Sequence, residues 1–385
     1  MPWLQTDPVQ QRSVLVAHAN AGTLNVSELA RVFGVSRKAV YKWVERADDG
    51  EPLTDRSRKP HSHPDATDPA VVERLVALRK QLGYGARKLI GWLELNEPWW
   101  LLPAASTVTE ILKRAGLVKP RRRRPRGEPC RTPFPDATEP NVVWSMDFKG
   151  DFRVGDGTRC YPLTVLDDHS RMALCCRSLP STARQPVERA LEQTFREWGL
   201  PQRIRSDNGT PFGTKCSGPL SELSVWLVKV GVRPEYSRPG SPQDNPRLER
   251  FHRTLKQATA FPPAATMAAQ QRRFNRYLPH YNDERPHEAL GQLPPRLVHV
   301  PSPRPFPSRV EDPAYPAHYD VMRLRERGCM TWKGARHSVG DPLTGELVGI
   351  VEVDNDVREI YFGPLRVAVL DERCDPPKLL PMFPV

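Results

Sequence analysis

The sequence lacks the patterns that assign many proteins to a class at once. Its seven cysteines are an odd number and include no Cys-x-x-Cys pair, so neither a disulfide framework nor a zinc site is expected. Cys175 and Cys176, adjacent in an apolar run, are expected to be core thiols on opposite faces of a strand. Residues 1–12 have no apolar signal core, and no run approaches membrane-spanning length. We therefore expect a cytoplasmic protein with no membrane partner.

Basic charge is in excess and is unevenly distributed. The chain has 57 Lys and Arg against 45 Asp and Glu, a net charge of +12 that favours a polyanionic partner. Residues 1–135 have a net charge of +9, residues 136–297 of +5, and residues 298–385 of −2. A chain of 385 residues is expected to form about two to four domains. Affinity for nucleic acid is therefore expected mainly in the first third.

Residues 8–47 are expected to form the three helices of a helix-turn-helix domain. Gly34 supplies the turn and Ser36 caps the third helix, with Val40 and Trp43 facing inward. The outward residues of that helix, offered to a major groove, are Arg37, Lys38, Tyr41 and Lys42. The alternative is a generic three-helix bundle with a solvated basic face.

The densest charge run of the chain follows a second group of expected helices in residues 69–118. It consists of Arg121, Arg122, Arg123 and Arg124 and is followed by a proline. Its like charges oppose a packed helix, so we expect an extended arm. The arm is expected to contact the DNA backbone or minor groove, which fixes position more than sequence. A solvated tether is the alternative.

Residues 136–297 alternate strands and helices, as in a mixed sheet with helices on both faces. Asp147 interrupts the apolar run 142–148, which is typical of a buried strand, where aspartate is rare. Asp207 directly follows a short strand at 203–206, and ligands of such sheets gather at strand ends. A simple turn is the alternative for Asp207, because Asp-Asn-Gly is a common turn sequence.

A third carboxylate, Glu249, lies on an expected helix over residues 244–260. At about 100° per residue, Glu249, Arg253 and Lys256 share one face, opposite a buried one. That layout lets the carboxylate bind a metal ion while the two cations hold a DNA backbone. The alternative is an i,i+4 salt bridge between Glu249 and Arg253, worth about 0.3–0.5 kcal/mol.

A rival acidic cluster occurs at Asp167-Asp168-His169-Ser170, between two expected strands. It is typical of a hairpin turn capped by one of the two aspartates, and Asp168→Asn is accordingly expected to be mild. No nucleophile-elbow motif surrounds Ser170, so a serine nucleophile is not expected.

The three acids occur in motifs that resemble those of a known family. The motifs are Trp144-Ser145-Met146-Asp147-Phe148, Ser206-Asp207-Asn208-Gly209, and Asp244-Asn245-Pro246-Arg247-Leu248-Glu249-Arg250-Phe251-His252-Arg253-Thr254-Leu255-Lys256. In this order they resemble DDE transposases, and more narrowly bacterial insertion-sequence transposases with a retroviral-integrase-type core. The resemblance implies a ribonuclease-H-like fold in which Asp147, Asp207 and Glu249 converge as catalytic residues. It also implies that these three acids bind two Mg²⁺ or Mn²⁺ ions.

The resemblance covers nearly the whole chain and implies a multidomain protein. The expected segments are a helix-turn-helix domain (1–50), a linker (51–68), a second helix-turn-helix domain (69–120), a basic arm (121–135), the ribonuclease-H-like α/β core (136–297), a proline-rich linker (298–317) and a small β-barrel (318–385). Residues 298–317 contain six prolines, which favours a semi-rigid spacer.

The activity implied by the resemblance is binding of the terminal inverted repeats of an element, followed by metal-dependent hydrolysis and DNA strand transfer. The implied partners are double-stranded DNA, both element ends and target, and further copies of the chain in a homodimer or higher homo-oligomer at the nucleoid. A second hypothesis is a catalytically silent DNA-binding repressor derived from a transposase. It stays open because similar transposases usually have Asn-Gly where this chain has Asn245-Pro246.

Overall fold

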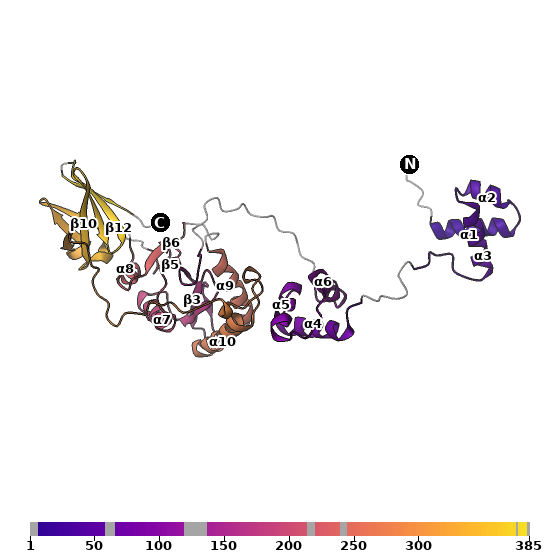
Figure 1. Cartoon of the computed structure of the whole chain (residues 1–385), viewed down its shortest axis with the longest axis horizontal. Helices are drawn as coiled ribbons and strands as arrows, with labels where there is room; N and C mark the ends of the chain where they lie inside the picture. Colours follow the sequence, from indigo (N-terminus) through magenta and orange to yellow (C-terminus); the bar gives the residue numbers. More distant parts are fainter. Residues whose placement is uncertain are drawn as a thin grey trace. The chain divides into compact units, whose positions relative to one another are not determined.

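The protein divides into two compact units, Met1–Thr67 and Asp68–Val385 (Figure 1). The computed structural model describes residues 7–57, 66–118, 137–213, 220–238, 245–374 and 376–382. The predicted arginine arm and Asp244 lie outside the described residues. Within the described residues, no helix is long and apolar enough to cross a membrane.

The first unit is a bundle of three short helices, as predicted. They are α1 (Pro8–Asn20), α2 (Val26–Val32) and α3 (Arg37–Asp48). A capping box between Asn25 and Glu28 begins α2, and the Ser36 hydroxyl accepts a hydrogen bond from the backbone at the start of α3. Gly34, with φ +64°, makes the turn between the two helices. Leu29 and Val40 are fully buried between them.

Three further helices open the second unit. They are α4 (Pro69–Leu82), α5 (Ala86–Asn96) and α6 (Ala105–Arg114). Asp68 caps α4, and Gly83 ends it in the left-handed conformation. Leu75, Leu89 and Val108, one from each helix, are fully buried in their shared core. The predicted helices are present, while their role in DNA reading stays a prediction.

The core of the second unit is a six-stranded mixed sheet. Its strands are β1 (Val143–Phe148), β2 (Phe152–Arg153), β3 (Arg159–Asp167), β4 (Ala173–Leu179), β5 (Arg203–Ser206) and β6 (Arg233–Tyr236). The order is β2-β3-β1-β5-β6, with β4 paired to β3. β1 runs antiparallel to β3 and parallel to β5, so the predicted mixed sheet is confirmed.

Helices cover both faces of this sheet. They are α7 (Arg184–Trp198), α8 (Glu222–Lys229), α9 (Pro246–Thr259) and α10 (Met267–Pro279). Trp144 and Met146 of β1 pack with α7 and α8 in one apolar cluster, whereas α9 and α10 pack in another. Cys175 belongs to the first cluster and Cys176 to the second, which confirms that they are buried thiols on opposite faces.

The predicted C-terminal β-barrel is corrected to an open sheet. The strands are β7 (Asp320–Arg323), β8 (Cys329–Trp332), β9 (Ala335–Ser338), β10 (Leu347–Asp354), β11 (Val357–Phe362), β12 (Leu365–Asp371) and β13 (Lys378–Pro381). Five of them form an antiparallel sheet in the order β13-β12-β11-β10-β7, and β8 pairs with β9 in a separate two-stranded sheet. Closure would need β7 to pair with β13, but both are four-residue edge strands in the described chain. Pro381 also brings no N–H to such a pairing.

The proline-rich segment before this sheet is packed on the core. Ser302 N donates to Trp198 O at 2.7 Å, and Leu200 N donates to Arg304 O at 2.7 Å. Phe306 packs against the apolar cluster of α7 and α8. These contacts hold residues 302–306 along the end of α7.

Candidate functional site

Asp147 and Asp207 are brought together by the register of two neighbouring parallel strands. β1 and β5 pair Val143 with Arg203, Trp144 with Ile204 and Ser145 with Arg205, each an offset of 60 residues. Continued for two residues, the same offset sets Asp147 beside Asp207. Register partners in a parallel pair point to the same face, on strands about 4.8 Å apart.

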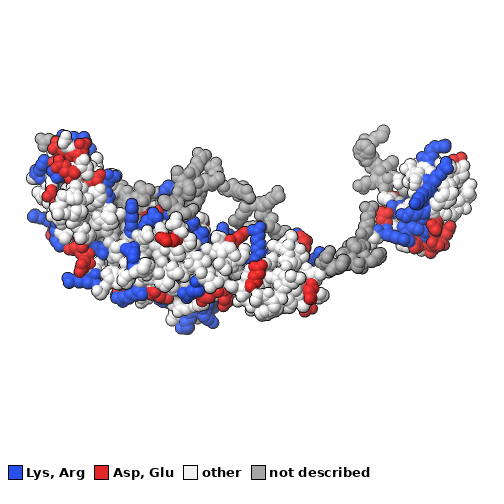
Figure 2. Space-filling model, in the orientation of Figure 1, with Lys and Arg blue, Asp and Glu red and all other residues white. Residues whose placement is uncertain are grey.

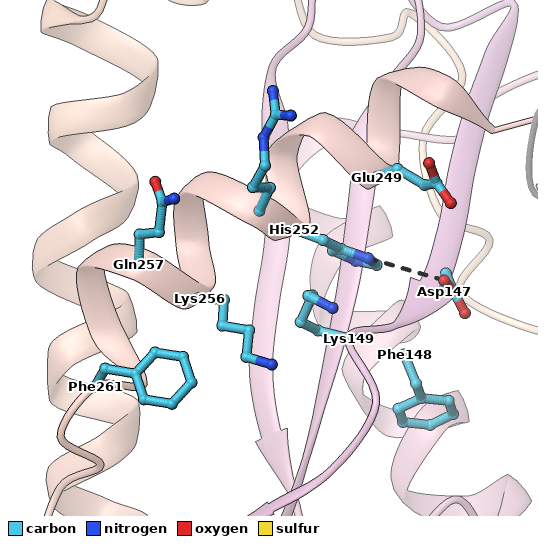
Figure 3. Close-up of a pocket in the computed structure, with 9 residues that line it drawn as sticks. Asp147, Phe148, Lys149, Glu249, His252, Lys256, Gln257 and Phe261 are labelled. Carbon is cyan, nitrogen blue, oxygen red and sulfur yellow. Dashed lines mark ion pairs between the residues drawn. The ribbon is translucent and has the colours of Figure 1, made fainter. Parts of the chain in front are cut away.

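Asp147 lines a pocket of about 550 Å³ together with Glu249 of α9 (Figure 3). The two carboxylates project toward the same space from β1 and from the helix that covers it. Burial, the charge of Asp207 and, to a smaller extent, the charge of Glu249 together raise the pKa of Asp147 to about 7. The pKa of Asp147 therefore responds to both other acids of the predicted triad.

Asp207 is a turn residue and also lies beside Asp147 by strand register. It is exposed at the end of β5, and its Oδ1 accepts a hydrogen bond from Gly209 N at 3.1 Å. A Cβ at position 209 would lie 3.0 Å from Asp207 Oδ2, so glycine leaves room for the carboxylate. Asn208 Nδ2 donates to Ser237 O at 2.7 Å, which ties the turn to the end of β6. The predicted turn thus fixes the position of the acid.

Glu249 lies in the first turn of α9, which begins at Pro246. Asn245 stands at the N-cap without a side-chain cap bond, and its carbonyl accepts from Glu249 N at 3.1 Å. The Asn245 side chain instead donates to Ser237 Oγ at 3.2 Å and accepts from Ser145 Oγ at 3.4 Å. Pro246 therefore falls where no intrahelical N–H is needed, and the helix forms as expected.

The salt bridge that was the alternative reading of Glu249 is not formed. In the described part of the chain, Glu249 and Arg253 make no ion pair, although they are four residues apart on one helix. Arg253 and Lys256 are exposed and line the same pocket as Glu249. Lys149 lines it from the sheet side, so three cations surround the two carboxylates.

His252 is a site residue that the sequence analysis missed. Its Nδ1 lies 3.9 Å from Asp147 Oδ2, and its Nε2 lies 2.6 Å from Thr164 Oγ1. Burial lowers the pKa of His252 to about 3, with Lys149 adding to the shift, so the ring is neutral. The contact dashed in Figure 3 is accordingly a polar contact of a neutral ring. Its position three residues after Glu249, on the same helix face, was the available signal.

The rival aspartates form the predicted turn, but Asp168 does more than that. Asp167 caps the turn by accepting from Ser170 N at 2.7 Å. Asp168 is 3% exposed, accepts from Ser145 Oγ at 2.6 Å, and lies 3.3 Å from an Arg205 nitrogen. It also reaches Arg247 of α9 at 3.6 Å. Asp168 therefore lies in the expected turn, and it also joins that turn to β5 and α9, which the sequence did not predict.

The donor set suits a hard divalent cation, although the side chains do not form a closed site. Among the described residues, no three His, Cys, Asp or Glu side chains converge closely enough to hold a metal ion. Asp147, Asp207 and Glu249 offer only carboxylate oxygens, which Mg²⁺ and Mn²⁺ prefer. After burial, the negative charges of Asp207 and Glu249 raise the pKa of Asp147, and a bound cation would neutralise these charges.

The predicted DNA-reading residues form an exposed face on α3. The exposed side chains are Arg37, Lys38, Tyr41 and Lys42. Val40 and Trp43 point the other way, into the core. Figure 2 shows a band of basic side chains over this unit on the face drawn. This surface suits contact with a polyanion.

The chain matches three protein-family models and is similar to a protein encoded by an insertion element. Residues 137–242 and 230–295 match two models described as integrase core domain, and residues 12–73 match one described as winged helix-turn helix. The chain is 29% identical over 239 residues to the insertion element IS407 uncharacterized 31.7 kDa protein of Burkholderia multivorans, covering 60% of this chain and 81% of that protein.

A second relative and a solved structure are also similar to part of this chain. The chain is 30% identical over 187 residues to the insertion element IS476 uncharacterized 39.2 kDa protein of Xanthomonas euvesicatoria, covering 46% of this chain and 50% of that protein. The HTLV-2 integrase catalytic core domain in complex with magnesium aligns with a TM-score of 0.33 and 16% identity, over 42% of this chain and 99% of that one.

Proposed function

Because the chain belongs to the insertion-sequence transposases that have an integrase-type core and an N-terminal helix-turn-helix, we propose that it binds the terminal inverted repeats of its element and catalyses hydrolysis and strand transfer of phosphodiester bonds there. The observation that best supports this function is the shared register of Asp147 and Asp207, with Glu249 lining the pocket of Asp147. The proposed reaction is a polynucleotidyl transfer, in which water and later a DNA 3′-hydroxyl attack phosphorus and a bridging oxygen leaves.

Asp147, Asp207 and Glu249 are the proposed ligands of two divalent ions, Mg²⁺ or Mn²⁺. Bound there, such ions would lower the pKa of the attacking oxygen and neutralise charge on the leaving one. The residues around the acids have separate tasks. Arg253 and Lys256 hold the phosphate backbone at the pocket mouth, where both are exposed.

End recognition is proposed for the first unit. Arg37, Lys38, Tyr41 and Lys42 of α3 would enter a major groove of the terminal repeat. The arm of Arg121, Arg122, Arg123 and Arg124 would add contacts to the backbone, whatever the sequence. Two DNA ends must be joined to one target, so the working form is proposed to be a homodimer or a higher homo-oligomer.

The second hypothesis, a silent repressor, is not favoured by any feature of the described site. It was kept open by Pro246, the departure from the usual motif. Pro246 occupies the first helical position of α9, and the helix continues through Glu249 without a break.

The test of this function is cleavage and joining of DNA that carries the terminal repeats. Asp147→Asn, Asp207→Asn and Glu249→Gln each keep side-chain shape but remove a charge, and each is expected to abolish both steps while end binding persists. Glu192→Gln on α7, which removes the partner of Arg196 at the surface, is the matched control and should stay active. An active Glu249→Gln protein beside an inactive Asp244→Asn protein would move the third acid to Asp244.

A further inference from the structure

A second pocket, of about 440 Å³, lies on another side of α9 and is lined by cations. Its basic residues are Lys88, Arg171, Arg247, Arg250, Arg253 and Arg285. We call it the basic pocket. Among the described residues that line it, Glu288 is the one carboxylate, and that side chain is ion-paired with Arg87. The pocket therefore has a large excess of positive charge.

Few acids compensate these cations from outside the pocket. Arg247 lies 3.6 Å from Asp168, which is already paired with Arg205. In the described ranges, Lys88, Arg171, Arg250 and Arg285 make no ion pair with a carboxylate. Cations left together without anions are unfavourable unless a bound anion offsets their repulsion.

The titratable groups of the basic pocket respond to this excess. Burial, followed by the charges of Arg285 and Arg250, lowers the pKa of Lys88 to about 8. Burial also lowers the pKa of His287 to about 3, with Lys88 as the next cause. Among the described residues, His287 Nε2 is a buried polar atom that has no hydrogen-bond partner.

The basic pocket is built by segments that are far apart in sequence. Lys88 comes from α5, Arg171 from the β3–β4 turn, and Arg285 from the chain that follows α10. Tyr84 holds α5 in place, because its hydroxyl lies 3.2 Å from His280 Nε2 and the two rings stack. The fold therefore brings these cations together from three regions of the chain, whereas a run of surface lysines would be adjacent through sequence alone.

One residue connects this pocket with the carboxylate pocket. At about 100° per residue along α9, Arg250 lies about 100° and Arg247 about 160° around the helix from Glu249. Arg253 lies only about 40° from Glu249, and it lines both pockets. A chain of phosphates leaving the acids would therefore meet Arg253 first and the basic pocket next.

We propose that the basic pocket binds a phosphate group of the DNA strand that passes through the carboxylate pocket. Planar guanidinium groups match phosphate oxygens in pairs, and five of the six cations are arginines. The assignment of DNA as the source of this phosphate rests on the proposed function. Binding of phosphate as such does not.

The first experiment therefore uses the full chain, without divalent metal or DNA. Titration of the wild type with inorganic phosphate, at constant ionic strength set by chloride, is expected to show saturable binding by calorimetry. The double variant Lys88→Gln/Arg250→Gln should bind phosphate at least tenfold more weakly. Arg196→Gln, a paired surface arginine on α7, is the matched control and should bind as the wild type does. Equal phosphate affinity in the double variant, or no binding by the wild type, would overturn the proposal.

The second experiment identifies the source of the phosphate. End DNA with a neutral methylphosphonate at single backbone positions is scanned for binding to the metal-free wild type. One or two positions near the scissile bond should weaken binding about tenfold, and the double variant should be insensitive at those positions. If phosphate binds but no position distinguishes the two proteins, the pocket takes free phosphate and the DNA assignment fails. Cleavage is not measured in either experiment, so failure of the catalytic proposal would be seen separately.

Discussion

His252 Nδ1 lies 3.9 Å from Asp147 Oδ2, while the Nε2 of the same ring lies 2.6 Å from the Thr164 hydroxyl. That hydroxyl donates its hydrogen to Asp147 O at 3.0 Å. The neutral ring is then left to donate from Nε2, which turns the lone pair of Nδ1 toward the Asp147 carboxylate. His252 thus joins α9 to β1 and β3 and acts as a positioning residue for Asp147.

Replacing His252 tests that positioning role. His252→Ala removes the link to Thr164 and leaves space beside Asp147, so the turnover number for cleavage is expected to fall about 10–100-fold. The KM for end DNA should change little, because the ring is almost fully buried and the exposed cations Arg253 and Lys256 are unchanged. His252→Gln, which keeps a donor for Thr164, should recover part of the loss. An unchanged turnover number in His252→Ala would contradict the role.

The burial of Asp147 predicts that the carboxylate proposed to bind metal lowers the stability of the folded protein. The pKa of Asp147 is about 7 in the folded protein, against 3.8 for a free side chain. Between pH 3.8 and about 7, Asp147 is protonated in the folded chain but not in the unfolded chain. The free energy of unfolding therefore falls as the pH rises through this range, and the lost stability is not recovered at higher pH. Asparagine is neutral at every pH. Asp147→Asn is therefore expected to raise the free energy of unfolding at pH 8.

The expected gain is about 1–2 kcal/mol, less than the full pKa shift implies, because a third of the side chain is exposed. Urea unfolding with a chelator present should show the difference at pH 8 and none below pH 3.8. Added Mg²⁺ should stabilise the wild type only, since binding to the folded state shifts its equilibrium. A variant less stable than the wild type at pH 8 would contradict the pKa assignment.

The buried contacts of Asp168 predict a large effect on stability. Asp168→Asn removes one of the two carboxylates that pair with Arg205 among the described residues, and it removes the ion pair with Arg247. Because burial raises the pKa of Asp168 and Arg205 keeps Glu235, the loss should be smaller than that of a fully broken buried pair, about 3–5 kcal/mol, but thermal unfolding should still move to lower temperature. Asp151→Asn, which breaks a surface pair with Arg159, is the control and should cost less than about 1 kcal/mol. Equal losses in the two variants would mean that burial does not matter here.

The identity of the cation gives a further check of the acids. Activity is expected with Mg²⁺ or Mn²⁺ and should be weak with Ca²⁺, whose longer bonds and looser geometry misplace the reacting oxygens. Cleavage of end DNA at equal concentrations of each ion measures this. Full activity with Ca²⁺ alone, or after treatment with a chelator, would argue against a site made of three carboxylates.

Much of the core was predictable because local chemistry and tertiary structure agree there. The strands at 203–206 and 233–236 have the predicted bounds, and each begins shortly after a positive-φ glycine, Gly199 or Gly231, that ends the preceding helix. The constant offset of the β1–β5 register repeats the 60-residue spacing of Asp147 and Asp207 in the sequence. Proximity of these two acids therefore follows from strand pairing alone.

Other features depend on contacts that no local pattern reveals. The role of Asp168 arises from Arg205 and Arg247, which lie 37 and 79 residues away in the chain. The C-terminal strands were recognised by alternation, but alternation does not say whether the outer strands pair, and β7 and β13 remain edges. α10 was not predicted at all, and its apolar face is buried against both β4 and α9.

The exposed basic face of α3 is expected to set the preference for end DNA. Replacing Arg37, Lys38 and Lys42 together with alanine should reduce preference for end DNA over unrelated DNA, because base contacts in the major groove set specificity. Each residue is exposed and outside the core of the first unit, so the fold should survive. Arg31→Ala, an exposed basic change on α2, is the control and should keep the preference. By contrast, replacing Arg121 to Arg124 should weaken binding to all DNA alike and reduce its dependence on salt. Binding measured on both DNAs at several salt concentrations separates the two effects, and an arm variant that lost only specificity would reverse the assignment.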